Sequence, residues 1–183
     1  HVVSPVAGGT LLPRIVRGMR ELATVGLVDG ALPRVYAAQA AGCAPVVNAL
    51  LAGADHPEPV RPDTIAKSIA IGNPADGYQV IQTVRATGGT GTAASDDRIL
   101  DALHLLAETE GIFTEPAGGT TLAGAIDLIK RGIIPRDESI VVCVTGNGYK
   151  TTEVVADAVV EPVHLTRAFK DFETWWESRR ALA

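Results

Sequence analysis

The chain has 183 residues, of which 46% are hydrophobic, and its net charge is −5. This length suffices for one domain with a packed core. The net negative charge and the aromatic content of only 4% disfavour nucleic acids as partners. The chain has no excess of basic residues to release counterions from phosphates and few aromatic residues to stack on bases. No run is apolar enough to span a membrane and no signal peptide is recognised, so we expect a cytoplasmic protein that acts on small molecules.

The N-terminal half alternates short strands with helices. An extended run over 2–6 passes through two glycines into a helix that Thr10 is expected to cap. The apolar positions of this helix repeat with a helical period and predict a core face made of Leu11, Leu12, Ile15, Val16, Met19, Leu22 and Ala23. The elements expected next are a strand over 34–40, a helix over 45–51, a loop over 53–62 and a strand within 87–94.

The C-terminal half continues the alternation. Its expected elements are a helix capped by Ser95 with Ile99, Leu103, Leu106 and Ala107 on its core face, a strand over 111–114, a helix after 115–119 that ends at Gly132, and a closing strand over 139–144. Strands alternating with helices predict an α/β fold with a mostly parallel sheet and helices on both faces.

A single α/β domain is expected over 1–183, with the main body in 1–150 and a tail in 151–183. The tail contains Pro162 and a helix ending in Trp175-Trp176, and we expect it to pack across the domain or across a partner subunit.

Isolated reactive side chains offer little chemistry. Cys43 and Cys143 lie far apart without C-x-x-C spacing, so we expect reduced thiols, with Cys143 inert inside the closing strand. His56 and His104 have no second ligand at metal-binding spacing, which favours structural roles and predicts no metal site.

Two glycine loops carry the candidate chemistry. Residues 7–10 precede a helix, and free N–H groups at a helix N-terminus suit a phosphate, although a tight turn also explains the glycine pair. Thr145 ends a buried strand, which places its hydroxyl either at the ligand-binding carboxyl edge of the sheet or against its own turn. Neither loop is a G-x-G-x-x-G or Walker A motif, so a nucleoside triphosphate is not expected.

Five segments, in one order, resemble the C-terminal half of threonine synthase. They are Ser4–Leu11, Gln39–Cys43, Val60–Tyr78, Leu105–Gly119 and Thr145–Thr151, within residues 2–151. Threonine synthases are pyridoxal 5′-phosphate (PLP) enzymes of fold type II, the tryptophan-synthase-β type, and convert O-phospho-L-homoserine and water to L-threonine and phosphate. The resemblance implies a phosphate-eliminating lyase of amino-acid biosynthesis. It also implies the large PLP-binding domain of that fold, lacking its N-terminal part.

The resemblance makes the two loops one cofactor site. It implies that the Thr145 hydroxyl faces the pyridine nitrogen of PLP and that the cofactor phosphate is held by backbone groups of Ala7, Gly8, Gly9 and Thr10. Glu115 either approaches the cofactor ring or serves as a helix-capping or loop carboxylate, and the second role is preferred.

No catalytic residue is assigned within the chain. The Schiff-base lysine of the family lies in an upstream segment, which none of the four lysines matches: Lys67, Lys130, Lys150 and Lys170. The segment around Lys170 imitates it only by coincidence. The chain is therefore expected to be a fragment or half of a split enzyme, inactive until a missing N-terminal segment or partner chain supplies the lysine.

Other interpretations stay open. The chain can belong to a related PLP enzyme, such as cysteate synthase or threonine dehydratase, because the residues that select the substrate are mostly absent. It can also be a non-catalytic PLP-binding or scaffold domain. The family implies a homodimer for the complete enzyme.

Overall fold

The computed structural model describes residues 1–156 and 163–180, and its body is built on a four-stranded parallel sheet in the order β3-β2-β1-β4. The strands are β1 (Val2–Pro5), β2 (Val35–Ala40), β3 (Gly91–Ala94) and β4 (Val141–Val142). The helices are α1 (Leu11–Thr24), α2 (Pro45–Ala52), α3 (Gly77–Ala86), α4 (Asp96–Glu110), α5 (Pro116–Lys130) and α6 (Phe169–Arg180). The predicted parallel α/β architecture is confirmed. In the described part of the chain, no helix is long and apolar enough to cross a membrane.

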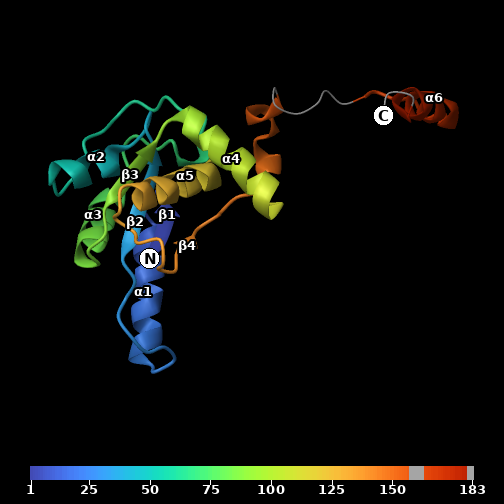
Figure 1. Ribbon diagram of the computed structural model, residues 1–183. Helices are drawn as coiled ribbons and strands as arrows, with labels where there is room; N and C mark the ends of the chain where they lie inside the picture. Colours follow the sequence, from blue (N-terminus) through green and yellow to red (C-terminus); the bar gives the residue numbers. More distant parts are fainter. Residues whose placement is uncertain (157–162, 181–183) are drawn as a thin grey trace.

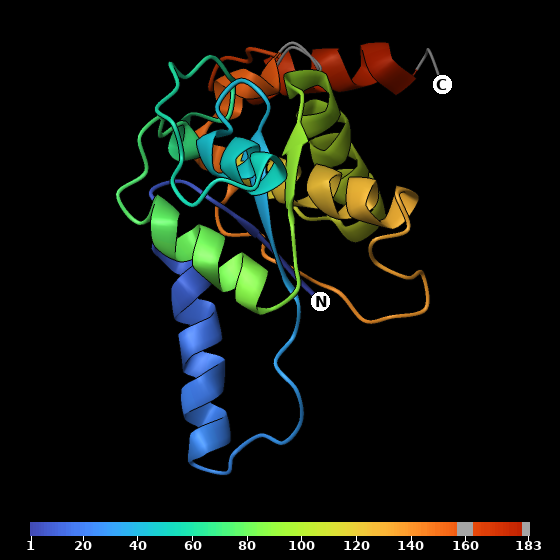
Figure 2. The same ribbon diagram turned by 90° about the vertical axis from the view of Figure 1, so that its left-hand side faces the viewer.

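Helices cover both faces of the sheet because both faces of its strands are apolar. Along β1, Val2 packs with the cluster formed by α1, α2 and α3, whereas its neighbour Val3 packs on the opposite face with α5. Tyr36 and Ala37 divide between the two clusters in the same way along β2. The strands run between these two groups of helices (Figures 1 and 2). Successive side chains of a strand point to opposite faces, so a continuous apolar run requires cover on both.

Helix α5 lies buried between the sheet and α4, and small residues permit this close packing. A Cβ atom on Gly119 would lie 2.7 Å from the carbonyl oxygen of Ile99, and one on Gly124 would lie 2.6 Å from the Cγ2 atom of Thr92. The backbone of α5 therefore contacts both neighbours directly, which fixes the position of its first turn at the edge of the sheet.

Helix α1 is only half buried, which corrects the predicted core face. Leu12 and Val16 are buried, but Leu11 and Leu22 are each 43% exposed. At 1.5 Å per residue α1 is about 21 Å long, while β1 spans only about 13 Å. The second half of α1 therefore projects beyond the sheet (Figure 1).

Helix α3 is absent from the sequence-based prediction. It is rich in β-branched residues, among them Val80, Ile81 and Val84, which favour a strand by local propensity. All three are buried against the cluster on the α1 side of the sheet. Tertiary packing therefore overrides the local preference of this segment.

Two predicted strands and two predicted caps also need correction. The segment 111–114 is not a strand and contributes only one bridge, between Thr114 and Asn147, while the closing strand shrinks to Val141–Val142. Thr10 and Ser95 precede α1 and α4 as expected, yet neither side chain caps its helix. The predicted end of α5 is confirmed, because Gly132 follows it with a φ of +68°.

The tail helix α6 stands away from the α/β body (Figure 1). Phe169, Phe172 and Trp176 are exposed on it, so the expected packing across the domain is not seen in the described residues. Packing across a partner subunit stays a prediction. Pro162 lies outside the described residues.

Candidate functional site

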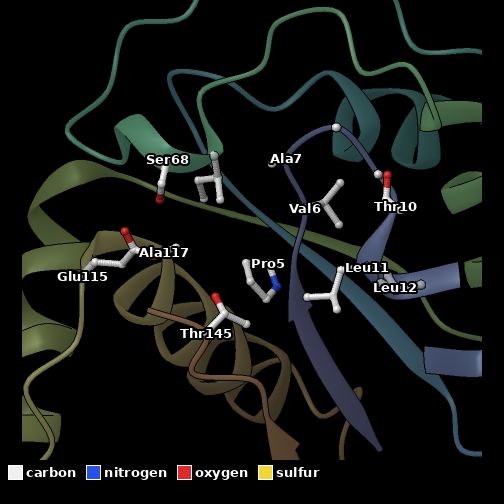
Figure 3. Close-up of a pocket in the computed structure, with 13 residues that line it drawn as sticks. Pro5, Val6, Ala7, Thr10, Leu11, Leu12, Ser68, Glu115, Ala117 and Thr145 are labelled. Atoms are coloured by element: carbon white, nitrogen blue, oxygen red, sulfur yellow. The ribbon is translucent and has the colours of Figure 1, made fainter. Parts of the chain in front are cut away.

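A pocket of about 300 Å³ opens at the carboxyl edge of the sheet (Figure 3). It is lined by residues 5–12 and by Ser68, Ile69, Glu115, Ala117 and Thr145. All five residues expected at a ligand site are among them, so the structure brings together two loops from opposite ends of the chain. The size and place are typical of small-molecule sites in α/β folds.

The first wall of the pocket is the loop between β1 and α1. The N–H groups of residues 7–10 donate no hydrogen bond to any group in the described part of the chain. They sit directly before the N-terminus of α1, where the helix dipole adds partial positive charge. Consecutive free N–H groups at such a position form a binding site for an anion.

The start of α3 holds this loop in shape. The Asp76 N–H donates to the carbonyl oxygen of Gly8 at 2.9 Å, and the Thr10 hydroxyl donates to Asp76 Oδ2 at 2.7 Å. Gly9 has a φ of +100°, and a Cβ atom there would lie 2.9 Å from the carbonyl carbon of Asp76. Thr10 itself has helical backbone angles, with a φ of −71° and a ψ of −40°, and not the extended angles of a capping residue, which explains why its side chain does not cap α1.

Gln39 supports the same loop from inside the core. This fully buried side chain donates from Nε2 to the carbonyl oxygen of Val6 at 3.2 Å. Its Oε1 accepts from the N–H groups of Val46 and Val47, both at 3.0 Å. One amide therefore fixes the entrance to the anion loop and the first turn of α2.

The second wall is the loop that carries Thr145. The carbonyl oxygen of Gly146 accepts from Thr114 Oγ1 at 2.8 Å and from the Glu115 N–H at 3.1 Å. The Thr145 hydroxyl makes no hydrogen bond within the described residues, so the alternative of a hydroxyl bonded to its own turn is not observed. Thr145 is exposed at the pocket and free to contact a ligand.

Replacing Thr114 with valine is expected to loosen this loop. The substitution removes one of two donors to the Gly146 carbonyl, which should lower the free energy of unfolding by about 1 kcal/mol. Hydrogen exchange measured by mass spectrometry should be faster at the amides of 145–148. Thr114→Ser should restore the wild-type rate, and Thr109→Val, on the exposed face of α4, should leave it unchanged. Equal exchange in Thr114→Val and wild type would show that this hydroxyl does not position the loop.

Sequence reasoning missed part of the pocket. Ser68, on a 3₁₀ turn over Lys67–Ile69, and Ala117, in the first turn of α5, had no assigned role. The Glu115 side chain does not cap α5, which contradicts the helix-capping half of the preferred interpretation, and Glu115 lines the pocket. All three lie within the segments 60–78 and 105–119 that carry the resemblance. Their place in these segments was the one feature of the sequence that could have marked them as site residues.

The remaining reactive side chains take other positions. Burial raises the pKa of the Cys43 and Cys143 thiols, which keeps both protonated and weakly nucleophilic at neutral pH. His56 stacks on Tyr78 with ring centroids 4.9 Å apart. All four lysines belong to the described residues, and none of them lines the pocket.

Known proteins resemble this chain in sequence. The sequence model of the family described as "Pyridoxal-phosphate dependent enzyme" matches residues 1–146. The threonine synthase of Methanocaldococcus jannaschii is 37% identical over 166 residues, which cover 90% of this chain and 41% of that protein. The threonine synthase of Mycobacterium tuberculosis strain H37Rv is 37% identical over 167 residues, which cover 87% of this chain and 44% of that protein. The resemblance to threonine synthases is confirmed, and the chain spans less than half the length of these relatives.

Solved structures share the fold. The L-serine ammonia-lyase of Rhizomucor miehei matches with a TM-score of 0.65 at 23% identity, covering 86% of this chain and 50% of that one. Threonine deaminase isoform 2 of Solanum lycopersicum matches with a TM-score of 0.64 at 19% identity, and the match covers 87% of this chain and 44% of that one. These identities support a common fold alone. From the family match over residues 1–146, the chain belongs to the pyridoxal-phosphate dependent enzymes, whose cofactor is pyridoxal 5′-phosphate.

Proposed function

We propose that this chain is the PLP-binding part of a threonine synthase-like lyase, which converts O-phospho-L-homoserine and water to L-threonine and phosphate. The observation that carries the proposal is the pocket at the carboxyl edge of the sheet, where a loop of free N–H groups faces a loop with a free hydroxyl. The 37% identity to threonine synthases favours this reaction over those of other PLP enzymes.

The residues of the first wall fit the phosphate of PLP. Residues 7–10 offer unpartnered N–H groups at a helix N-terminus, and a Cβ atom on Gly8 would meet only the Ile71 side chain, at 3.8 Å. The loop therefore leaves room for a phosphate close to the backbone. In the proposed site, these N–H groups donate to the phosphate oxygens and anchor one end of the cofactor.

Thr145 orients the other end. Its hydroxyl would make one hydrogen bond to the pyridine nitrogen, and as a neutral group it adds no charge there. Bound PLP acts as an electron sink, which lowers the barrier to removing protons from the amino-acid substrate. A neutral hydroxyl cannot by itself hold a proton on the ring nitrogen, so Thr145 alone keeps that sink moderate, which suits elimination and replacement chemistry.

The lysine that bonds the cofactor would come from outside this sequence, since no lysine of the described residues lines the pocket. We propose that the chain alone is inactive and that the whole enzyme is a cytoplasmic homodimer. The same observation supports a second candidate function, a domain that binds PLP without catalysis.

The first experiment incubates the chain with PLP, measures binding by calorimetry, reduces the mixture with borohydride and locates pyridoxyl groups by peptide mass spectrometry. We expect one reversible site that inorganic phosphate competes for, with sparse, scattered labelling of lysines. Stoichiometric labelling of Lys150 or Lys170 would overturn the assignment of the lysine to another segment. Absence of any binding would contradict the proposed site.

The complete protein separates the two candidate functions. Phosphate release from O-phospho-L-homoserine by the full-length protein supports the synthase, and PLP binding without turnover of this or related substrates supports the non-catalytic domain.

A further inference from the structure

Glu115 carries a carboxylate that the proposed function leaves unused. The residue is 6% exposed and precedes α5, where its carbonyl oxygen accepts from the N–H groups of Gly118 at 2.9 Å and Gly119 at 3.4 Å. Its side chain forms no hydrogen bond and no ion pair with any group in residues 1–156 or 163–180. A carboxylate to which the protein donates no hydrogen bond must contact solvent or a ligand.

The carboxylate reaches the open space of the pocket. Within the described part of the chain, no side-chain oxygen is both fully buried and without a hydrogen-bond partner. The Glu115 oxygens, which have no partner, are therefore accessible to solvent, and Glu115 is one of the residues that line the pocket (Figure 3).

Glu115 also lies beside Thr145. A Cβ atom on Gly146, the next residue, would fall 1.8 Å from Glu115 Oε1, so the carboxylate rests against the backbone of the Thr145 loop. Across the pocket, Ala7 and Thr10 mark the wall with the free N–H groups (Figure 3). The pocket thus has a positive wall at the α1 N-terminus and a negative group at the opposite wall.

Nothing in the described lining of the pocket balances that negative charge, because the lining contains no arginine, lysine or histidine. A ligand with an anionic phosphate at one end and a positively charged nitrogen at the other complements both walls. We propose that Glu115 binds a positively charged nitrogen of the bound ligand and so contributes to the site together with Thr145. This inference rests on the proposed function. The nitrogen comes from one of two sources, the protonated ring of the cofactor or the ammonium group of the amino-acid substrate.

The test compares the wild-type chain with Glu115→Gln, which has nearly the same shape without the charge. The first two probes are inorganic phosphate and pyridoxine 5′-phosphate, which carries the ring but needs no lysine, and binding is measured by calorimetry at several pH values. If the ring is the source, Glu115→Gln should bind pyridoxine 5′-phosphate about tenfold more weakly. The ultraviolet spectrum of the bound ring should then shift toward the unprotonated form, while the affinity for inorganic phosphate stays unchanged.

If the ammonium group is the source, the affinity for pyridoxine 5′-phosphate is unchanged. Binding of O-phospho-L-homoserine weakens instead, measured on the chain loaded with pyridoxine 5′-phosphate, which has no aldehyde to condense with the amine. Glu115→Asp, which keeps the charge, should recover part of the lost affinity, and the exposed Glu108→Gln should behave as wild type. Thermal unfolding verifies that each variant is folded.

The failure of this inference differs from that of the proposed function. If the Glu115→Gln variant matches the wild type in affinity and in spectrum with every probe, the proposed role of Glu115 is wrong, while the proposed cofactor site stands. A wild-type chain that binds neither inorganic phosphate nor pyridoxine 5′-phosphate overturns the site itself and the inference with it.

Discussion

Gln39→Leu should lower the free energy of unfolding by about 3 to 5 kcal/mol, because it leaves three backbone groups without a partner in a fully buried place. These are the carbonyl oxygen of Val6 and the N–H groups of Val46 and Val47. Leucine has a similar volume, so the loss reflects hydrogen bonding more than packing. Urea unfolding followed by circular dichroism measures it.

The position of Gln39 also predicts a functional effect. Since Val6 leads into the anion loop, the affinity for inorganic phosphate should fall in Gln39→Leu even where the protein remains folded. Gln79→Leu, on the exposed side of α3, is the matched control and should change stability by less than about 0.5 kcal/mol. A Gln39→Leu protein as stable as wild type would mean that water or a shifted backbone replaces the three bonds.

Gly9→Ala should distort the backbone of the anion loop. The φ of +100° is a conformation that alanine rarely adopts, and the new Cβ atom would meet the backbone of Asp76 at 2.9 Å, where no flexible side chain can move aside. We expect a loss of about 1 to 3 kcal/mol in the free energy of unfolding. We also expect at least tenfold weaker phosphate binding, equivalent to about 1.4 kcal/mol.

Two control substitutions make this prediction specific. Gly8→Ala places its Cβ atom 3.8 Å from Ile71 Cδ1, an ordinary contact, and should fold as the wild type does. Gly18→Ala, within α1 and with no atom within 4 Å of the new Cβ, should stabilise the protein by about 0.5 to 1 kcal/mol. Equal phosphate affinity in Gly9→Ala and Gly18→Ala would show that the shape of the loop does not depend on Gly9.

The sequence predicted those parts of the fold that local patterns determine. The two loops of the pocket were joined into one site by the resemblance to threonine synthases and not by a local pattern. The strands next to glycines, β1 and β2, and the long amphipathic helix α4 were expected close to their observed bounds. Each depends on periodicity or on turn chemistry that lies within a few neighbouring residues.

The features that were missed depend on contacts between distant segments. Helix α3 forms because its β-branched residues pack on the sheet, and the Thr10 hydroxyl donates to Asp76, which belongs to a distant segment of the chain. The role of Glu115 follows from the position of Gly146, which lies in a different loop. No local pattern contains such information.

The order of the strands has a consequence for how the protein folds. The first strand, β1, lies between β2 and the last strand, β4, so the sheet is completed only when the two ends of the body meet. Contacts across so long a stretch of chain form slowly because the entropy of loop closure opposes them. The pocket uses a loop from each of these strands and cannot exist in a partly folded chain. Any molecule that fills it will therefore favour the closed sheet by mass action, and cofactor supply during synthesis should raise the yield of folded protein.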